Sequence, residues 1–203
     1  MANDIPMRQI RAKYSADTIT VYQAYNDAIA NAAITAQRFV PPFKTDRMTW
    51  IKPSFLWMMY RLGWATKPGQ TRVLAVQIRR SGFDWALEHS VLSHFNPDVH
   101  ESREAWKGAL SCASVRVQWD PERSVSLEKL HYRTIQVGLS AESSSRYADD
   151  WIHNISDVTA LAQKTHSAVL SKDADIARLM LPIELPYPLT SNIARTIGVG
   201  SVG

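Results

Sequence analysis

The sequence predicts an α+β fold: a single domain in which a mixed or antiparallel split sheet is flanked by helices. β-Branched and aromatic runs are interspersed with amphipathic segments, without the strict alternation of a doubly wound sheet. The 203 residues contain no repeat or low-complexity linker, and their 45% hydrophobic content is typical of a globular domain. We therefore expect one domain over residues 1–188 and a mobile tail over residues 189–203.

The first part of the chain carries clear start and stop signals. Asn26 and Ser54 can each cap a following helix, Pro41-Pro42 is typical of a loop, and Gly63 can end the second helix. The predicted segments are, in order, a strand at 19–25, a helix at 27–39, a loop at 40–47, a strand at 48–51, a helix from 55 to about 63 and a strand at 72–78.

In the second part of the chain, the elements are predicted from composition and from residues that interrupt helices and strands. The run DPER at 120–123 should stop a strand, Ser140 and Ser143 resemble a capping box, and prolines should extend the chain beyond Leu181. The predicted segments are helices at 82–95 and 102–110, strands at 115–119 and 132–139, and helices at 140–155 and 158–170.

Composition narrows the function classes. The net charge of +4 and the pI near 9.3 allow phosphate-bearing partners without requiring them. Cys112 is the single cysteine, and neither an HExxH, a GxGxxG nor a P-loop motif occurs, so we expect no metal site and neither nucleotide fold. No signal core or 18-residue apolar run is present, which predicts a soluble cytoplasmic protein without a membrane partner. The oligomeric state stays open.

The turn Lys52-Pro53-Ser54 is a candidate anion site. The free N–H groups at a helix start favour a phosphate or carboxylate, and Lys52 would neutralise it. Tyr22 or Trp50 could stack on a ring of the same ligand. The alternative is that Ser54 is only a helix cap and Lys52 is solvated.

Two glutamines interrupt apolar strands. Gln23 lies within VYQAY and Gln136 within YRTIQVGL, and a buried amide needs hydrogen-bond partners. Either both amides point into one cleft, or they pair with each other and only hold strands together. Gly138 would allow another part of the chain to approach the backbone closely.

The longest motifs carry a family resemblance. The runs VYQAY, TWIKPSFLWMMYR, VRVQWDPER and YRTIQVGL resemble an uncharacterised family of bacterial and fungal proteins, known as a domain of unknown function, over nearly the whole chain to about Pro188. This resemblance implies no activity.

The order of the predicted elements is also remotely similar to the ADP-ribosyltransferase superfamily. In that superfamily a first strand carries His or Arg, a second strand ends in Ser or Tyr before a helix, and a late strand often carries Glu. Gln136 stands where that Glu would be, and Glu142 lies six residues later. A phosphotransferase branch lacks the Glu and relies on cations, for which this chain offers Arg11, Lys52, Arg116 and Arg133.

The superfamily resemblance implies a function and a set of site residues. The implied function is binding of NAD, as substrate, or of a related ADP-ribose-bearing group, with transfer to an unknown nucleic-acid or protein acceptor. Catalytic roles fall on Gln23, Lys52 and Gln136, and cofactor-binding roles on Tyr22, Trp50, Lys52, Ser54 and Arg133. The alternatives are an RNA or nucleic-acid binding or processing module without NAD chemistry, and a catalytically inactive interaction domain.

Overall fold

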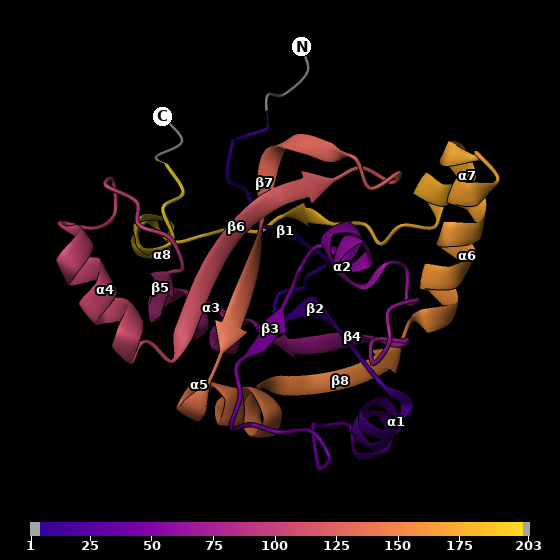
Figure 1. Cartoon of the computed structure of the whole chain (residues 1–203), viewed down its shortest axis with the longest axis horizontal. Helices are drawn as coiled ribbons and strands as arrows, with labels where there is room; N and C mark the ends of the chain where they lie inside the picture. Colours follow the sequence, from indigo (N-terminus) through magenta and orange to yellow (C-terminus); the bar gives the residue numbers. More distant parts are fainter. Residues whose placement is uncertain (1–4, 201–203) are drawn as a thin grey trace.

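The computed structural model of the chain describes residues 5–200, and these fold as mixed sheets with helices around them (Figure 1). The strands are β1 (Arg11–Ala12), β2 (Thr18–Tyr25), β3 (Thr49–Ile51), β4 (Arg72–Arg79), β5 (Ser90–Leu92), β6 (Val115–Arg123), β7 (Lys129–Leu139), β8 (Ile152–Asp157) and β9 (Leu185–Pro186). The helices are α1 (Asp27–Ala36), α2 (Phe55–Leu62), α3 (Arg80–Glu88), α4 (Arg103–Cys112), α5 (Ala141–Arg146), the π-helical turn η1 (Tyr147–Trp151), α6 (Thr159–Leu170), α7 (Ala174–Leu179) and α8 (Ser191–Thr196).

Two larger sheets lie side by side. One has the order β2-β4-β8 and is antiparallel, and the other has the order β3-β7-β6-β5, in which β5 and β6 are parallel. A single bridge joins them, since the Tyr22 N–H donates to the Lys52 carbonyl over 2.8 Å. The predicted α+β class, with a sheet split into antiparallel and mixed parts, is therefore confirmed. A small third sheet pairs β1 with β9.

Two apolar clusters hold these layers together. The larger contains inward-facing residues of both sheets, including Val21, Val76 and Val137. The smaller lies beneath α2 and contains Tyr22 and Met59. Within residues 5–200, no helix has both the length and the apolar character needed to cross a membrane.

Helix α2 forms where the sequence predicts it. The Ser54 Oγ accepts a hydrogen bond from the Trp57 N–H over 3.0 Å, which satisfies one of the free donors at the helix start. Gly63 ends the helix in the left-handed region with a φ of 59°, where a side chain would be strained. The turn before α2 is thereby fixed.

Two predicted helices are too long. Residues 82–95 were expected to be helical, but α3 ends at Glu88 and residues 90–92 form β5, which completes the sheet edge beside β6. Residues 140–155 end their helical part at Trp151 and continue as β8, because Ile152 and Ile155 pair with β4. In both cases strand pairing with a distant segment overrides local helix propensity.

The strand predicted to stop at 119 continues through Pro121 to Arg123. The register between β6 and β7 shifts there, and such an irregularity accommodates a residue without an N–H group.

The predicted mobile tail also differs from the structure. Residues 191–196 form α8, and Ile193 and Ile197 enter the main core. Residues 201–203 of that tail lie outside the described part.

Candidate functional site: a cation-lined cleft beside β2 and β3

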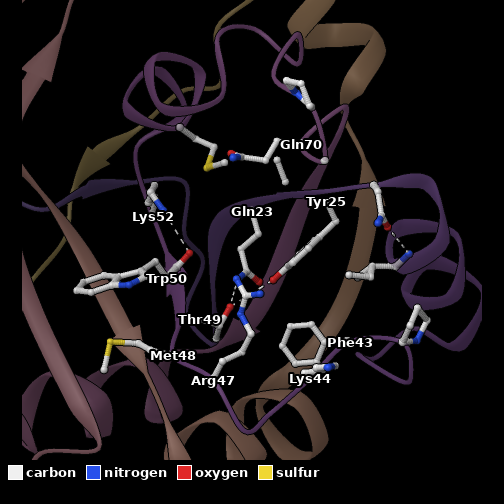
Figure 2. Close-up of a pocket in the computed structure, with 17 residues that line it drawn as sticks. Gln23, Tyr25, Phe43, Lys44, Arg47, Met48, Thr49, Trp50, Lys52 and Gln70 are labelled. Carbon is white, nitrogen blue, oxygen red and sulfur yellow. Dashed lines mark hydrogen bonds between the residues drawn. The ribbon is translucent and has the colours of Figure 1, made fainter.

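A cleft of about 530 Å³ opens beside the strands β2 and β3 that join the two sheets (Figure 2). Three of the predicted site residues, Gln23, Trp50 and Lys52, line it together. Its other lining residues are Ala24, Tyr25, Asn26, Ile29, Pro42, Phe43, Lys44, Arg47, Met48, Thr49, Met58, Pro68, Gly69 and Gln70. The site thus combines the ends of two strands with the loop that precedes β3.

Gln23 is held by a buried hydrogen-bond network. Its Nε2 donates to the Thr49 Oγ1 over 2.7 Å, and the Tyr147 hydroxyl donates to its Oε1 over 2.6 Å. The Tyr25 and Thr49 hydroxyls lie 3.3 Å apart. Burial raises the pKa of both Tyr25 and Tyr147, so these phenols stay neutral. Gln23 therefore faces the cleft in a fixed orientation, with one amide hydrogen left for another partner.

Lys52 is a buried amine without a carboxylate partner. Its side chain is 6% exposed, and its Nζ donates to the Trp50 carbonyl over 3.3 Å. Among residues 5–200, no acidic side chain forms an ion pair with it. Burial lowers the pKa of Lys52 to about 7; the charge of Arg61 acts in the same direction and that of Asp120 in the opposite one. The solvated Lys52 of the simpler interpretation is excluded, and the amine is partly neutral near pH 7.

The indole of Trp50 lies against Gly138. A Cβ added at Gly138 would come within 3.0 Å of the Trp50 ring and within 2.8 Å of the Met48 Sδ. The close backbone approach predicted at Gly138 is therefore present, and the group that approaches is a side chain of the cleft. Because Gly138 has no side chain, the Trp50 ring can lie against β7 and form one wall of the cleft.

The electrostatic character of the cleft is positive. Lys44 and Arg47 belong to the loop before β3 and, with Lys52, bring three cationic side chains to the lining. None of the described residues that line the cleft is acidic. A cleft with this excess of basic side chains favours an anionic group of a ligand.

The start of α2, predicted as the anion site, already holds carboxylates of the chain itself. The Phe55 N–H donates to Glu184 Oε1 over 2.8 Å, and the Ser54 hydroxyl donates to Glu122 Oε1 over 3.0 Å. Burial raises the pKa of Glu184 to about 8, and the neighbouring charge of Glu122 adds to this. Burial also raises the pKa of Glu122. Acidic side chains of the chain itself therefore occupy the donors of this helix start where an external anion was predicted, and Ser54 does not line the cleft.

Gln136 does not pair with Gln23, so that alternative is wrong. Its Nε2 donates to Asp120 Oδ2 over 2.6 Å, and Gln118 donates to the other oxygen of the same carboxylate over 2.8 Å. Gln136 is absent from the lining of the cleft. Glu142 forms an ion pair with Arg146 on the surface of α5 and does not replace the missing late-strand Glu.

Two further predicted site residues lie elsewhere. Tyr22 is 2% exposed and packs edge-on against Phe55, with ring centroids 5.4 Å apart, so its ring belongs to the core beneath α2. Arg133 donates to the Trp119 carbonyl over 3.0 Å and lines a different cavity. Gln23, Trp50 and Lys52 share one cleft, whereas Tyr22, Ser54, Arg133 and Gln136 do not line it.

Three polar residues of the cleft, Lys44, Arg47 and Thr49, were not predicted as site residues. The two cations stand in a proline-containing loop that was interpreted only as a connection, although a loop that carries cations directly before a strand is a common place for binding residues. Thr49 was assigned to a strand, and no local signal shows that its hydroxyl meets Gln23.

The fold and cleft define an α+β domain with a polar cleft lined by basic side chains. The sequence profile of a protein family described as "Domain of unknown function (DUF4291)" matches residues 9–187. The chain therefore belongs to this family, as the long motifs predicted. No curated protein matches the chain.

Proposed function

We propose that the cleft binds NAD or a related ADP-ribose-bearing nucleotide, and that the chain transfers the ADP-ribose group to an acceptor. The observation that carries this proposal is the lining of the cleft. Two exposed cations, Lys44 and Arg47, stand with the buried amine of Lys52 beside the half-buried rings of Phe43 and Trp50. No described residue of the lining carries a carboxylate. Phosphates require cations, and bases or nicotinamide require flat apolar surfaces.

The parts of such a ligand have distinct partners in the cleft. Lys44 and Arg47 are exposed and suit the pyrophosphate, whereas Lys52 and Gln23 lie deeper. The volume of about 530 Å³ is within the range of small-molecule sites. The phosphates are thus assigned to the loop before β3 rather than to the start of α2, where Glu184 and Glu122 lie.

Transfer would break the bond between the nicotinamide nitrogen and C1 of the ribose. Nicotinamide leaves as a neutral molecule with the bonding electrons, and an oxygen or nitrogen of the acceptor bonds to C1 and loses a proton. A partly neutral Lys52 amine is suited to accept that proton. Since no carboxylate among the described lining residues can stabilise positive charge at C1, we expect transfer to be slow relative to binding.

Calorimetric titration with NAD tests the binding step. Charge-assisted contacts predict an affinity about 10- to 100-fold weaker in Arg47→Gln and in Lys52→Ala. Arg47 is exposed, so its replacement leaves the fold intact. Lys164→Gln, on the exposed face of α6, is the matched control and should bind as the wild type does.

If pure folded protein releases or absorbs no heat at millimolar NAD, NAD is excluded as the ligand. If Arg47→Gln binds NAD with unchanged affinity, this cleft is excluded as the NAD site. Release of nicotinamide, measured with and without candidate acceptors, tests transfer separately from binding. Salt-sensitive gel shifts of single-stranded RNA without any response to NAD would favour the nucleic-acid alternative.

A further inference from the structure

A second cavity, of about 790 Å³, shares no lining residue with the cleft. It lies between the N-terminal segment, the loop before α4, one residue of β7 and the segment around α8. Its lining residues are Pro6, Met7, Arg8, Asn96, Asp98, Val99, Arg133, Arg195, Gly198, Val199 and Gly200. Three of them are arginines and one is acidic.

Two of the arginines are placed together by the backbone. The Arg133 N–H donates to the Met7 carbonyl over 2.8 Å, and the Gln9 N–H donates to the Arg133 carbonyl over 3.4 Å. This parallel bridge sets Arg8 beside Arg133. Burial lowers the pKa of Arg8, the charge of Arg133 lowers it further, and the charge of Asp98 acts in the opposite direction. The two guanidinium groups therefore repel each other, and Asp98 offsets this repulsion in part.

In the described part of the chain, the polar partners of the two guanidinium groups are backbone carbonyls. Arg8 Nη1 donates to the Gly198 carbonyl over 2.6 Å, and Arg133 Nη1 donates to the Trp119 carbonyl over 3.0 Å. Carbonyls fix the direction of the two groups but carry no net charge. Within residues 5–200, no carboxylate forms an ion pair with Arg8, Arg133 or Arg195.

Gly198 is required for this arrangement. Its φ of 68° is in the left-handed region, and a Cβ there would lie 2.6 Å from Arg8 Nη1. A glycine therefore allows the chain after α8 to approach Arg8 and hold its guanidinium at the cavity wall.

We propose that this cavity binds the phosphate group of a phosphomonoester. Arginine matches phosphate oxygens with paired donors, and three arginines against Asp98 leave a surplus of about two positive charges, which matches a phosphomonoester near neutral pH. The cavity is larger than a phosphate ion. Met7, Val99 and Val199 offer apolar contact to the organic part of the ligand.

Calorimetry on the full chain with inorganic phosphate and with phenyl phosphate tests this assignment. Arg133→Gln and Arg195→Gln should each weaken binding about 10- to 100-fold. Arg195 is exposed on α8, so Arg195→Gln should fold normally. Its affinity for phosphate therefore tests the proposed site even if Arg133→Gln fails to fold. Phenyl phosphate should bind more tightly than inorganic phosphate because of the apolar lining.

Two matched controls separate this cavity from other cations. Arg178→Gln changes an exposed arginine on α7, and Lys164→Gln changes an exposed lysine on α6; both lie outside the two cavities and should bind phosphate as the wild type does. The proposal is overturned if phosphate fails to bind, if Arg195→Gln binds with unchanged affinity, if affinity is lost in Arg47→Gln instead, or if phenyl phosphate is not the tighter ligand.

Discussion

The two sides of the Lys52-Pro53-Ser54 turn carry opposite kinds of buried charge. On one side, the Lys52 amine lines an open cleft and donates to one carbonyl. On the other side, the carboxyl groups of Glu122 and Glu184 accept hydrogen bonds from Ser54 and Phe55 at the start of α2. An amine and carboxyl groups that are all driven towards neutrality thus lie on the two sides of one turn, since the donors Ser54 and Phe55 directly follow Lys52-Pro53.

The difference lies in the partners. The carboxyl groups accept hydrogen bonds from the helix start, whereas the Lys52 amine donates to one uncharged acceptor and lines the cleft. Because a buried group with few partners is costly for stability, it is a stronger functional candidate than one that the fold already satisfies. This contrast places the candidate site on the Lys52 side of the turn.

Among the predicted changes in the free energy of unfolding, the largest is expected from Lys52→Met. The pKa of Lys52 is lowered in the folded state, so between about pH 7 and pH 10.5 the unfolded chain binds more protons and folding stability rises with pH. Methionine removes the buried amine and should raise the free energy of unfolding at pH 7 by a few kcal/mol, with a smaller gain at pH 10. Urea unfolding at both pH values measures this. An equal gain at both would contradict the lowered pKa.

The second-largest change in the free energy of unfolding is expected from Ser54→Ala. This change removes the cap of α2 and leaves Glu122 without its hydroxyl donor, so it should destabilise the protein by about 2–3 kcal/mol. Thr190→Ala removes the cap of α8, where no carboxylate depends on the hydroxyl, and should cost about 1 kcal/mol. Urea unfolding of both variants gives the comparison, and equal losses would show that the contact with Glu122 contributes nothing.

The smallest change in the free energy of unfolding is expected from Glu184→Gln. The pKa of Glu184 is raised to about 8, so the folded chain binds more protons than the unfolded chain above about pH 4.5, and stability falls as pH rises towards 8. Glutamine should therefore stabilise the protein at pH 8.5 and lose that advantage near pH 4.5. The gain should be smaller than for Lys52→Met, because Glu184 is half-buried and partly screened by solvent. Thermal unfolding at the two pH values tests the sign, and a gain that grows towards acid pH would contradict it.

The sequence predicted the elements whose signals are local. Helix α2 was predicted from its cap Ser54 and its end at Gly63, and strands β2 and β4 from their β-branched runs. Elements set by distant partners were missed. β5 exists because β6 offers it a parallel edge, and α8 forms part of the fold because Ile193 and Ile197 fill the core.

The same distinction applies to the site. Gln23, Trp50 and Lys52 were grouped from the superfamily resemblance and from the turn before α2, and the structure brings them together beside the bridge between the sheets. Gln136 could not be separated from them by sequence, because its partner Asp120 stands in a run that was interpreted as the end of a strand. Likewise, no pattern before α2 indicates that Glu184, more than 120 residues later, would bind its first N–H group.

The pairing of β1 with β9 has a consequence for how the chain can be shortened at its ends. The family match starts at residue 9 and ends at residue 187, and the Tyr187 N–H donates to the Ile10 carbonyl over 2.8 Å. The two ends of the matched region therefore lie side by side. The segments that flank it also stay together, since the Arg8 guanidinium donates to the Gly198 carbonyl over 2.6 Å. Truncation of either flank would therefore remove a contact of the other.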